Sequence, residues 1–301
     1  MDFSNEVKER FTFKNDILFK WALQGEDDDT QRVRNVIISS VTGLNVVYSE
    51  VRNPEVLPEK ADFKNMYLDI LVRTQEGIYI DIEMQSSSFG DAARDKSLAY
   101  LARLYSNQLK GTEPYRFAPA HQIIFVDVRS KHDDVLISHM KIQDEMGNCL
   151  SNKMQTHIVY MPYIDDILKH KCINELTLTE AIVYLFQNGI TDDTIELSKK
   201  YQEVAILMYK EDQFNDVESL YTVAESRKRF LVMQAAHMED ARNEGLEEGR
   251  AEGRAEGRAE GEQKSLRLIT KLIADGKSDL IEKVAQDQEL REQLYKEYHI
   301  E

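Results

Sequence analysis

The stretch 66–85 places acidic side chains at alternate positions between apolar ones. Apolar residues occupy every second position in both of its halves, a pattern typical of two β-strands that each bury one face. The remaining face carries Asp69, Asp81, Glu83 and Gln85. Carboxylate oxygens that converge from neighbouring strands are suitable ligands for Mg²⁺ or Mn²⁺. The spacing therefore points to metal-dependent chemistry on this face.

The alternation also fixes how the two strands pair. Paired residues in a hairpin point to the same face, so the loop between the strands must have an odd number of residues. Residues 75–77 meet this requirement, with Gly77 where the common three-residue loop needs a left-handed conformation. In this register Asp69 lies opposite Glu83, with their Cβ atoms roughly 5 Å apart. Solvent, a proton, a basic side chain or a divalent cation must offset the repulsion between these two acids.

A solvated surface is the alternative explanation of the acidic face. Half-buried hairpins normally carry polar side chains on the side that faces water. Asp81 shares this face but lies one pleat away from Glu83, so we expect it to be solvated or to support Glu83. Taken alone, the hairpin favours the solvated surface over the metal site.

Composition restricts the class of protein. The chain has 301 residues, of which 42% are hydrophobic and 31% charged, and its net charge is -16. Such a charge argues against broad electrostatic binding of nucleic acid, but a metal-dependent nuclease site is itself acidic. Two cysteines do not form a disulfide framework, and no apolar run is long enough to span a membrane. We therefore expect a cytoplasmic protein with no membrane partner.

Hydrophobic periodicity predicts the elements that must position the hairpin. Helices are expected over 11–23, 30–42 and 91–110. Strands are expected over 44–52, 121–128 and 156–161, and a ragged hairpin over 134–153. This order of helices and strands predicts an α/β or α+β domain across roughly residues 10–165.

The chain after residue 165 is predicted to be helical. Thr177 and Glu180 have the spacing of a capping box. Further helices are expected over 194–210, 216–241, 266–273 and 277–301. Residues 248–261 repeat the four-residue unit Glu-Gly-Arg-Ala, and each Gly costs about 1 kcal/mol relative to Ala in a helix. The repeat is therefore either a flexible charged tether or a helix that forms against a partner.

Three groups of motifs occur in order along the chain. Phe13-Lys-Asn-Asp-x-x-Phe-Lys20 opens it, Leu68-Asp-Ile70 and Ile82-Glu-Met-Gln85 lie on the hairpin, and Lys96-x-x-x-Tyr100 follows on the next predicted helix. Together with the downstream repeat, this order resembles the recombination-promoting nuclease (Rpn) family, also described as PD-(D/E)XK nuclease family transposases. The resemblance covers roughly residues 10–250. It implies an α/β fold with a restriction-endonuclease-like mixed sheet flanked by helices, followed by an α-helical C-terminal region.

The resemblance also implies roles for residues of the hairpin. Asp69 takes the place of the metal-binding Asp and Glu83 that of the second acid, so both would hold Mg²⁺ or Mn²⁺. Gln85 stands where the wider superfamily has Lys. Because Gln is neutral, it can orient water or substrate through hydrogen bonds but cannot stabilise an anion by charge. More of the electrostatic work would then fall on the metal.

Three further residues are candidates outside the hairpin. By analogy with superfamily members that supply an acid from a helix, Asp16 would be an additional catalytic acid; the alternative is a capping Asp. Lys96 and Tyr100 could contact phosphates of the DNA backbone. The alternative for this pair is an ordinary amphipathic helix.

The predicted function is that of a metal-dependent endonuclease that hydrolyses DNA phosphodiester bonds, with a role in recombination. The alternative is a nuclease-fold protein with little or no activity, which acts as an oligomeric interaction module. We expect a homo-oligomer that forms through the C-terminal helices. The predicted organisation is a nuclease core over 1–165, a helical region over 166–244, the repeat tract over 245–264 and a helical tail over 265–301.

Overall fold

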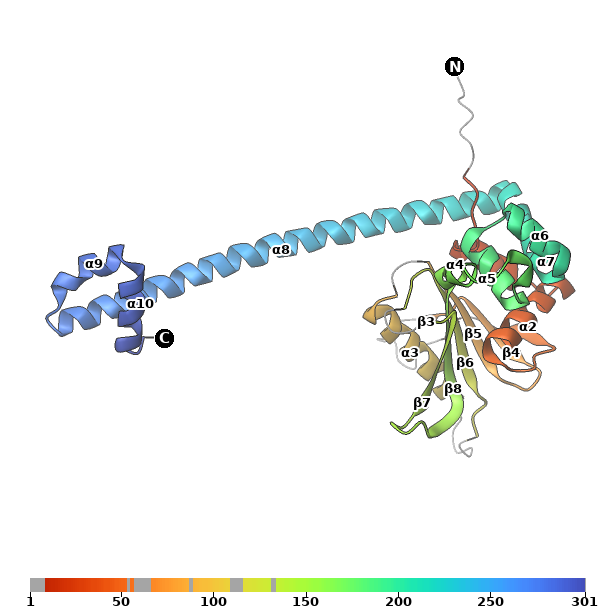
Figure 1. Cartoon of the computed structure of the whole chain (residues 1–301), viewed down its shortest axis with the longest axis horizontal. Coiled ribbons are helices and arrows are strands. Elements are labelled where there is room, and N and C mark those ends of the chain that lie inside the picture. Colours follow the sequence, from red (N-terminus) through yellow and green to blue (C-terminus); the bar gives the residue numbers. More distant parts are fainter. Residues whose placement is uncertain are drawn as a thin grey trace, which may run out of the picture. The chain divides into compact units, whose positions relative to one another are not determined.

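The computed structural model of the chain describes residues 9–52, 55–56, 66–86, 89–108, 116–130 and 134–300. They divide into two compact units, Met1–Arg227 and Lys228–Glu301. The first unit contains a six-stranded sheet with the acidic hairpin, and the second consists of helices (Figure 1). No helix within the described ranges combines the length and the apolar character needed to cross a membrane.

The six-stranded sheet has the order β1-β4-β5-β6-β8-β7. Its strands are β1 (Ser49–Arg52), β4 (Ile70–Thr74), β5 (Tyr79–Gln85), β6 (Ala120–Val126), β7 (Ile137–Gln143) and β8 (Cys149–Tyr160). β6 is parallel to both β5 and β8, whereas the other neighbours are antiparallel. Two further strands, β2 (Glu55–Val56) and β3 (Met66–Tyr67), pair with each other. The mixed sheet flanked by helices confirms the predicted fold class.

Five helices supply most of the helical side chains in the apolar core on one face of the sheet. They are α1 (Asp16–Leu23), α2 (Asp28–Thr42), α5 (Leu178–Asn188), α6 (Asp192–Lys200) and α7 (Gln202–Asp216). The Asn15 side chain caps α1 by accepting from two backbone N–H groups, and Gly43 ends α2 with a φ of 75°. The predicted capping box of Thr177 and Glu180 begins α5. Helices that follow residue 165 therefore belong to the same core as the sheet. Three short elements join the sheet to these helices, namely η1 (Met161–Tyr163), α4 (Ile164–Ile167) and η2 (Ile173–Glu175).

Helix α3 (Asp91–Ser106) covers the other face of the hairpin. Its Leu101 and Leu104 pack with Leu68 and Leu71. We predicted that Leu68 would point to the same face as the other even-numbered apolar residues. That prediction is wrong, because the backbone bends at Asp69 and separates β3 from β4. The predicted end of this helix, over 109–110, lies outside the described residues.

Two predicted boundaries differ from the structure because of tertiary contacts. The predicted helix over 194–210 is interrupted at Tyr201, which has an extended backbone and separates α6 from α7. The Tyr201 hydroxyl donates to the Leu176 carbonyl oxygen (2.8 Å), a contact that periodicity does not reveal. The strand predicted over 156–161 and the second arm of the hairpin predicted over 134–153 are one continuous strand, β8.

The start of the described chain is bound to the end of α7. The Phe11 N–H donates to the Asn215 side-chain oxygen (2.7 Å), and the Asn215 amide donates to the Phe11 carbonyl (2.9 Å). The residue before Asn215, Phe214, packs against α1: the centre of its ring lies 5.7 Å from the centre of the Trp21 ring. Helix α1 is therefore held in place by residues from the far end of the first unit.

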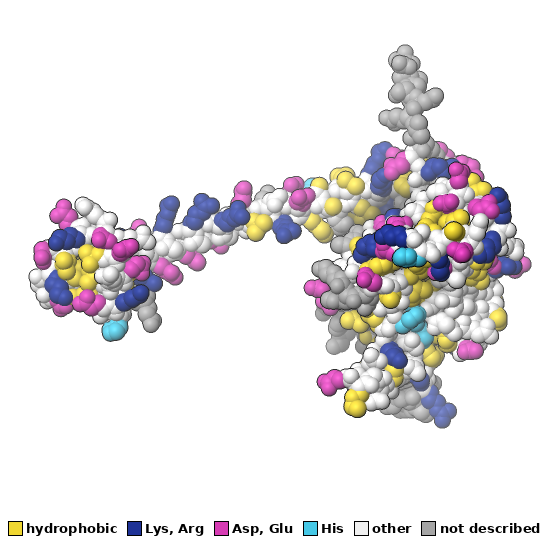
Figure 2. All heavy atoms as spheres, in the orientation of Figure 1, with side chains coloured by type: hydrophobic (Ala, Val, Ile, Leu, Met, Phe, Trp, Pro, Cys, Tyr) yellow, Lys and Arg dark blue, Asp and Glu magenta, His cyan; other side chains and the backbone are white. Residues whose placement is uncertain are grey.

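The second unit contains most of α8 (Glu218–Ala274), followed by η3 (Ser278–Leu280), α9 (Ile281–Gln286) and α10 (Gln288–Glu297). Leu268, Leu272, Val284 and Leu294 form its small apolar cluster. The Glu-Gly-Arg-Ala repeat is part of α8, and the separate helix predicted over 266–273 is its last part. Figure 2 shows hydrophobic side chains along the first half of α8 and charged ones along the repeat.

Candidate active site

The hairpin of β4 and β5 has the predicted register. Ile70 pairs with Ile82, so the preceding residue, Asp69, faces Glu83. Gly77 ends the three-residue loop with a φ of 81°, as the alternation of side chains predicted. The hairpin therefore brings together the two acids that the sequence singled out.

Each of the two acids accepts a hydrogen bond from the backbone of the strand that carries the other. The Asp69 N–H donates to Glu83 Oε1 (3.0 Å), and the Met84 N–H donates to Asp69 Oδ2 (3.2 Å). Both side chains are largely shielded from solvent. The bend at Asp69 makes this exchange possible, because it frees the Asp69 N–H from the regular ladder of the sheet.

Helix α1 contributes two side chains to the same aspartate. Lys20 Nζ lies 2.7 Å from Asp69 Oδ1, and Gln24 Nε2 donates to the Asp69 carbonyl oxygen (2.9 Å). Lys20 and Gln24 are four residues apart, so they lie on the same side of the helix. Sequence reasoning assigned no role to either residue. The available signal was the position of Lys20 in the opening motif together with this four-residue spacing.

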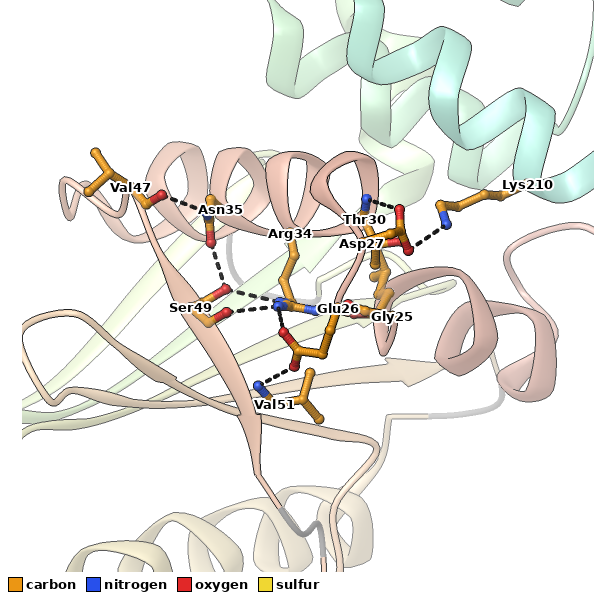
Figure 3. Close-up of polar contacts among 11 residues, drawn as sticks. Gly25, Glu26, Asp27, Thr30, Arg34, Asn35, Val47, Ser49, Val51 and Lys210 are labelled. Atoms are coloured by element: carbon orange, nitrogen blue, oxygen red, sulfur yellow. Dashed lines mark hydrogen bonds and ion pairs between the residues drawn. The ribbon is translucent and has the colours of Figure 1, made fainter.

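A buried arginine fixes the end of α1 that carries Gln24 (Figure 3). Arg34 is fully buried and donates to the carbonyl oxygens of Leu23 (2.9 Å) and Gly25 (2.7 Å), the two residues that flank Gln24. It also donates to the carbonyl oxygen (2.8 Å) and the hydroxyl oxygen (2.9 Å) of Ser49 in β1. Arg34 thus joins the end of α1 to the sheet and keeps Gln24 beside Asp69.

The acidic face is buried at Asp81. This residue is 1% exposed, so the solvated surface that we considered for it is wrong: α3 and the neighbouring strand β6 exclude water from this position. Gln122 Nε2 donates to Asp81 Oδ2 (2.7 Å), and Ser97 donates to the Gln122 oxygen from α3. Among the residues that the structure describes, no hydrogen-bond partner of Asp81 Oδ1 is found. Burial, followed by the nearby charge of Glu83, raises the pKa of Asp81 well above its usual value.

Glu83 has an unusual affinity for protons. Burial, and then the negative charge of Asp69, raise the pKa of Glu83 from 4.5 to about 7. Lys96, the Asp69 N–H and Lys20 oppose this shift by stabilising the ionised carboxylate. A carboxyl group with a pKa near neutrality beside a second acid is typical of functional sites.

A small hollow of about 30 Å³ lies between β5, β6 and α3, next to Glu83. Its lining residues are Glu83, Gln85, Phe89, Ala93, Lys96, Ser97, Tyr100, Gln122 and Ile124. Lys96 Nζ lies 5.0 Å from the centre of the Tyr100 ring, so the ring face supports the ammonium group. The structure therefore gathers Glu83, Gln85, Lys96 and Tyr100 around one opening.

Asp16 is placed differently from these residues. It is the first residue of α1, one helical turn before Lys20, and its Oδ2 lies 3.4 Å from Arg227 Nε. Asn15, rather than Asp16, caps the helix. No contact of Asp16 with Asp69 or Glu83 is found among the described residues.

The structure also brings together three histidines that sequence spacing did not connect. His157 Nδ1 lies 2.8 Å from His139 Nδ1, and His157 Nε2 lies 3.3 Å from His121 Nδ1. His121 pairs with Ile80, so these rings lie on the face of the sheet opposite to Glu83. Because His157 uses a different nitrogen for each neighbour, the three rings form a hydrogen-bonded row rather than a shared metal site.

The donor set around Asp69 suits a hard divalent cation. Two carboxylates face each other, and their mutual repulsion, seen in the raised pKa of Glu83, would be relieved by positive charge. Within the described ranges, no group of three or more His, Cys, Asp or Glu residues has the arrangement of a metal site. Mg²⁺ commonly uses only one or two protein carboxylates, with water and phosphate oxygens as its other ligands. Asp69 and Glu83 fit that pattern.

Comparison with known proteins gives one match. A family model described as "PD-(D/E)XK nuclease family transposase" matches residues 13–242, which include the opening motif, the hairpin and α3. No curated protein and no solved structure matches the chain. The match extends over well over half of the chain and agrees with the mixed sheet and its paired acids. The chain therefore belongs to the family of PD-(D/E)XK nuclease family transposases.

Proposed function

We propose that this protein is a metal-dependent endonuclease that hydrolyses phosphodiester bonds in DNA. The observation that carries the proposal is the pairing of Asp69 with Glu83 beside the opening that Gln85 and Lys96 line. Cutting DNA would supply the ends from which recombination starts. The family of the chain supports this role but does not define the DNA that is cut.

Each residue of the site has a task that follows from its chemistry. Asp69 and Glu83 would hold Mg²⁺ or Mn²⁺, and the backbone bonds that each accepts keep their carboxylates oriented. When bound, the metal would supply Lewis-acid chemistry and a water of lowered pKa. The Gln85 amide can orient a water or a phosphate oxygen by hydrogen bonding. Lys96, supported by Tyr100, can bind a phosphate of the DNA backbone through its ammonium group.

Substitution of Asp69 tests this function directly. In Asp69→Asn, nicking of supercoiled plasmid DNA with Mg²⁺ or Mn²⁺ is expected to fall at least about 100-fold, because the metal loses a charged ligand. The matched control is Asp212→Asn, whose carboxylate pairs with Arg10 at the surface and should leave the rate unchanged. Equal nicking by Asp69→Asn and the wild type would exclude the proposal. A loss in Asp16→Asn as large as in Asp69→Asn would place Asp16 in the chemistry.

A second candidate function, self-association, is favoured by the surface of α8. Between residues 228 and 250 of this helix, six large apolar side chains are each more than 40% exposed, namely Phe230, Leu231, Val232, Met233, Met238 and Leu246. At all five glycines from Gly245 to Gly261, an added Cβ would meet only open space. Since Gly costs a helix about 1 kcal/mol relative to Ala, a solvated helix gains nothing from these residues. A second helix packed against these glycines would benefit from them, because the absence of a side chain lets the two backbones approach closely.

The charges of the repeat favour a parallel pair of α8 helices. In each unit a Glu precedes the Gly and an Arg follows it, so the two charges lie about 100° to either side of the Gly. When two such helices face each other in parallel, the Glu side of one meets the Arg side of the other on both flanks. In the antiparallel arrangement, Glu meets Glu and Arg meets Arg. The repeat therefore fits a parallel homodimer that contacts through its glycines.

Exchange of glycine for alanine distinguishes a paired helix from a solvated one. In the triple variant Gly249→Ala, Gly253→Ala, Gly257→Ala, we expect the dimer dissociation constant to rise at least about 10-fold, because added methyl groups hold the helices apart. Sedimentation equilibrium of the full chain measures the effect. The control is Ala251→Ser, Ala255→Ser, Ala259→Ser, which alters another stripe of the same helix. A higher melting temperature of the Gly→Ala variant with unchanged mass would show a solvated helix instead.

A further inference from the structure

The side chain of Lys20 occupies the place where positive charge is most needed in the site. Its Nζ lies 2.7 Å from Asp69 Oδ1. The other oxygen of this carboxylate accepts the Met84 N–H, the Asp69 N–H is bonded to Glu83, and the Asp69 carbonyl accepts from Gln24. Among these contacts with described residues, the one at Oδ1 is therefore the contact made by a cationic side chain that can leave.

The two contacts from α1 differ in how easily they can be exchanged. Gln24 lies at the end of the helix, where Arg34 binds both flanking carbonyl oxygens, so the Asp69 backbone has a fixed support. Lys20 is 32% exposed and carries its ammonium on a flexible four-carbon chain. The carboxylate can thus lose its ion pair while the backbone of Asp69 stays in place.

We propose that Lys20 is an exchangeable counter-ion of the metal site: it holds Asp69 Oδ1 until a divalent cation takes that oxygen. This inference rests on the proposed nuclease function. An ammonium group and a divalent cation cannot both occupy the same side of one carboxylate oxygen at bonding distance, so Lys20 competes with the metal. Without Lys20, Asp69 and Glu83 would repel each other with less compensation in the empty site.

Displacement of Lys20 would also supply a charge that the hairpin lacks. Gln85 is neutral, so the end of β5 brings no cation of its own to the scissile phosphate. Once released from Asp69, the Lys20 ammonium remains beside the site at the end of its side chain. It can then bind an oxygen of the DNA phosphate. Lys20 is therefore a positioning residue in the empty site and a phosphate-binding residue in the loaded one.

The proposal predicts opposite effects of one substitution on two measurements. In Lys20→Gln, calorimetry of the full chain with Mn²⁺ alone should show binding about 10-fold tighter, because the competing charge is gone. Plasmid nicking at saturating Mn²⁺ should fall about 10-fold or more, because the phosphate loses a cation. A purely structural ion pair would instead give weaker Mn²⁺ binding together with slower nicking.

Controls separate failure of this inference from failure of the proposed function. Lys199→Gln removes a surface lysine that pairs with Glu196, and both measurements should match the wild type. Lys20→Arg keeps the charge, so Mn²⁺ affinity should remain close to that of the wild type. If the wild type binds Mn²⁺ and nicks DNA, but Lys20→Gln binds Mn²⁺ no more tightly than the wild type, the inference about Lys20 is wrong and the proposed function stands. Absence of Mn²⁺ binding by the wild type would overturn both.

Discussion

Replacing Glu83 by Gln is expected to stabilise the metal-free fold by about 3 kcal/mol above pH 7, while it abolishes metal-dependent cleavage. The raised pKa of Glu83, about 7 in the fold against 4.5 in the reference state, corresponds to that free energy of unfolding at 1.36 kcal/mol per unit. Gln removes the buried negative charge and can still accept the hydrogen bond from the Asp69 N–H. The chain thus gives up stability to keep an ionisable group at this position.

The pH dependence of this effect has a definite sign. The folded pKa of Glu83 is higher than the unfolded one, so its contribution to stability is fully present below pH 4.5 and is lost as pH rises through about 7. Glu83→Gln has no carboxyl group at this position and cannot lose the contribution. The difference in the free energy of unfolding between the variant and the wild type should therefore grow from pH 4.5 to about pH 7 and then level off. Urea unfolding at several pH values with a metal chelator measures the difference.

A surface glutamate and added metal provide the controls for Glu83→Gln. Glu196→Gln, at an exposed ion pair with Lys199, should change stability by less than about 0.5 kcal/mol at every pH. Mn²⁺ should stabilise the wild type but not Glu83→Gln, since only the former offers two carboxylates. If Glu83→Gln were no more stable than the wild type at pH 8, the electrostatic strain inferred at this site would not exist.

Replacing Arg34 by Met should reduce the free energy of unfolding by about 4 kcal/mol, the largest loss we expect from one substitution. The change leaves the carbonyl oxygens of Leu23, Gly25 and Ser49 without donors in a buried site, at about 1–3 kcal/mol for each unsatisfied group. Met is similar in length and fills the space, so the loss reports the hydrogen bonds rather than a cavity. The midpoint of urea unfolding should fall without a change in the slope.

Arg10→Met serves as the control for Arg34→Met. Arg10 pairs with Asp212 where both side chains are about half exposed, so its loss should cost less than about 1 kcal/mol. A cost for Arg34→Met that is no larger than this would show that water can replace the guanidinium group. The interpretation of Arg34 as the fixed link between α1 and the sheet would then be wrong.

The hairpin shows which features of the site could be predicted from the sequence. Alternation of side chains alone gives the register that brings Asp69 opposite Glu83, because only one parity buries the apolar face. Alternation gives the wrong face for Leu68, because the bend at Asp69 turns this side chain toward α3. It places Asp81 on the correct face but cannot decide between a solvated carboxylate and one that supports Glu83, because the burial of Asp81 depends on a helix and a strand that follow later in the chain.

The support from α1 could not be derived from local patterns. A lysine in the last turn of a helix is ordinary, because it complements the helix dipole, so Lys20 did not stand out. Arg34 on a helix with apolar neighbours suggests a surface position, yet it is fully buried. Both roles arise from contacts between segments distant in sequence. His121, His139 and His157 likewise come from three different strands, and the pairing of these strands places their rings next to one another.

The binding of Phe11 by Asn215 has a consequence for the order in which the chain can fold. The acids of the hairpin emerge from the ribosome soon after α1, but α1 rests on Phe214 and its preceding segment is bound by Asn215. A nascent chain that ends before α7 therefore carries Asp69 and Glu83 without a settled helix to hold them. The two acids can therefore be held against a fixed α1 only after most of the first unit has been synthesised.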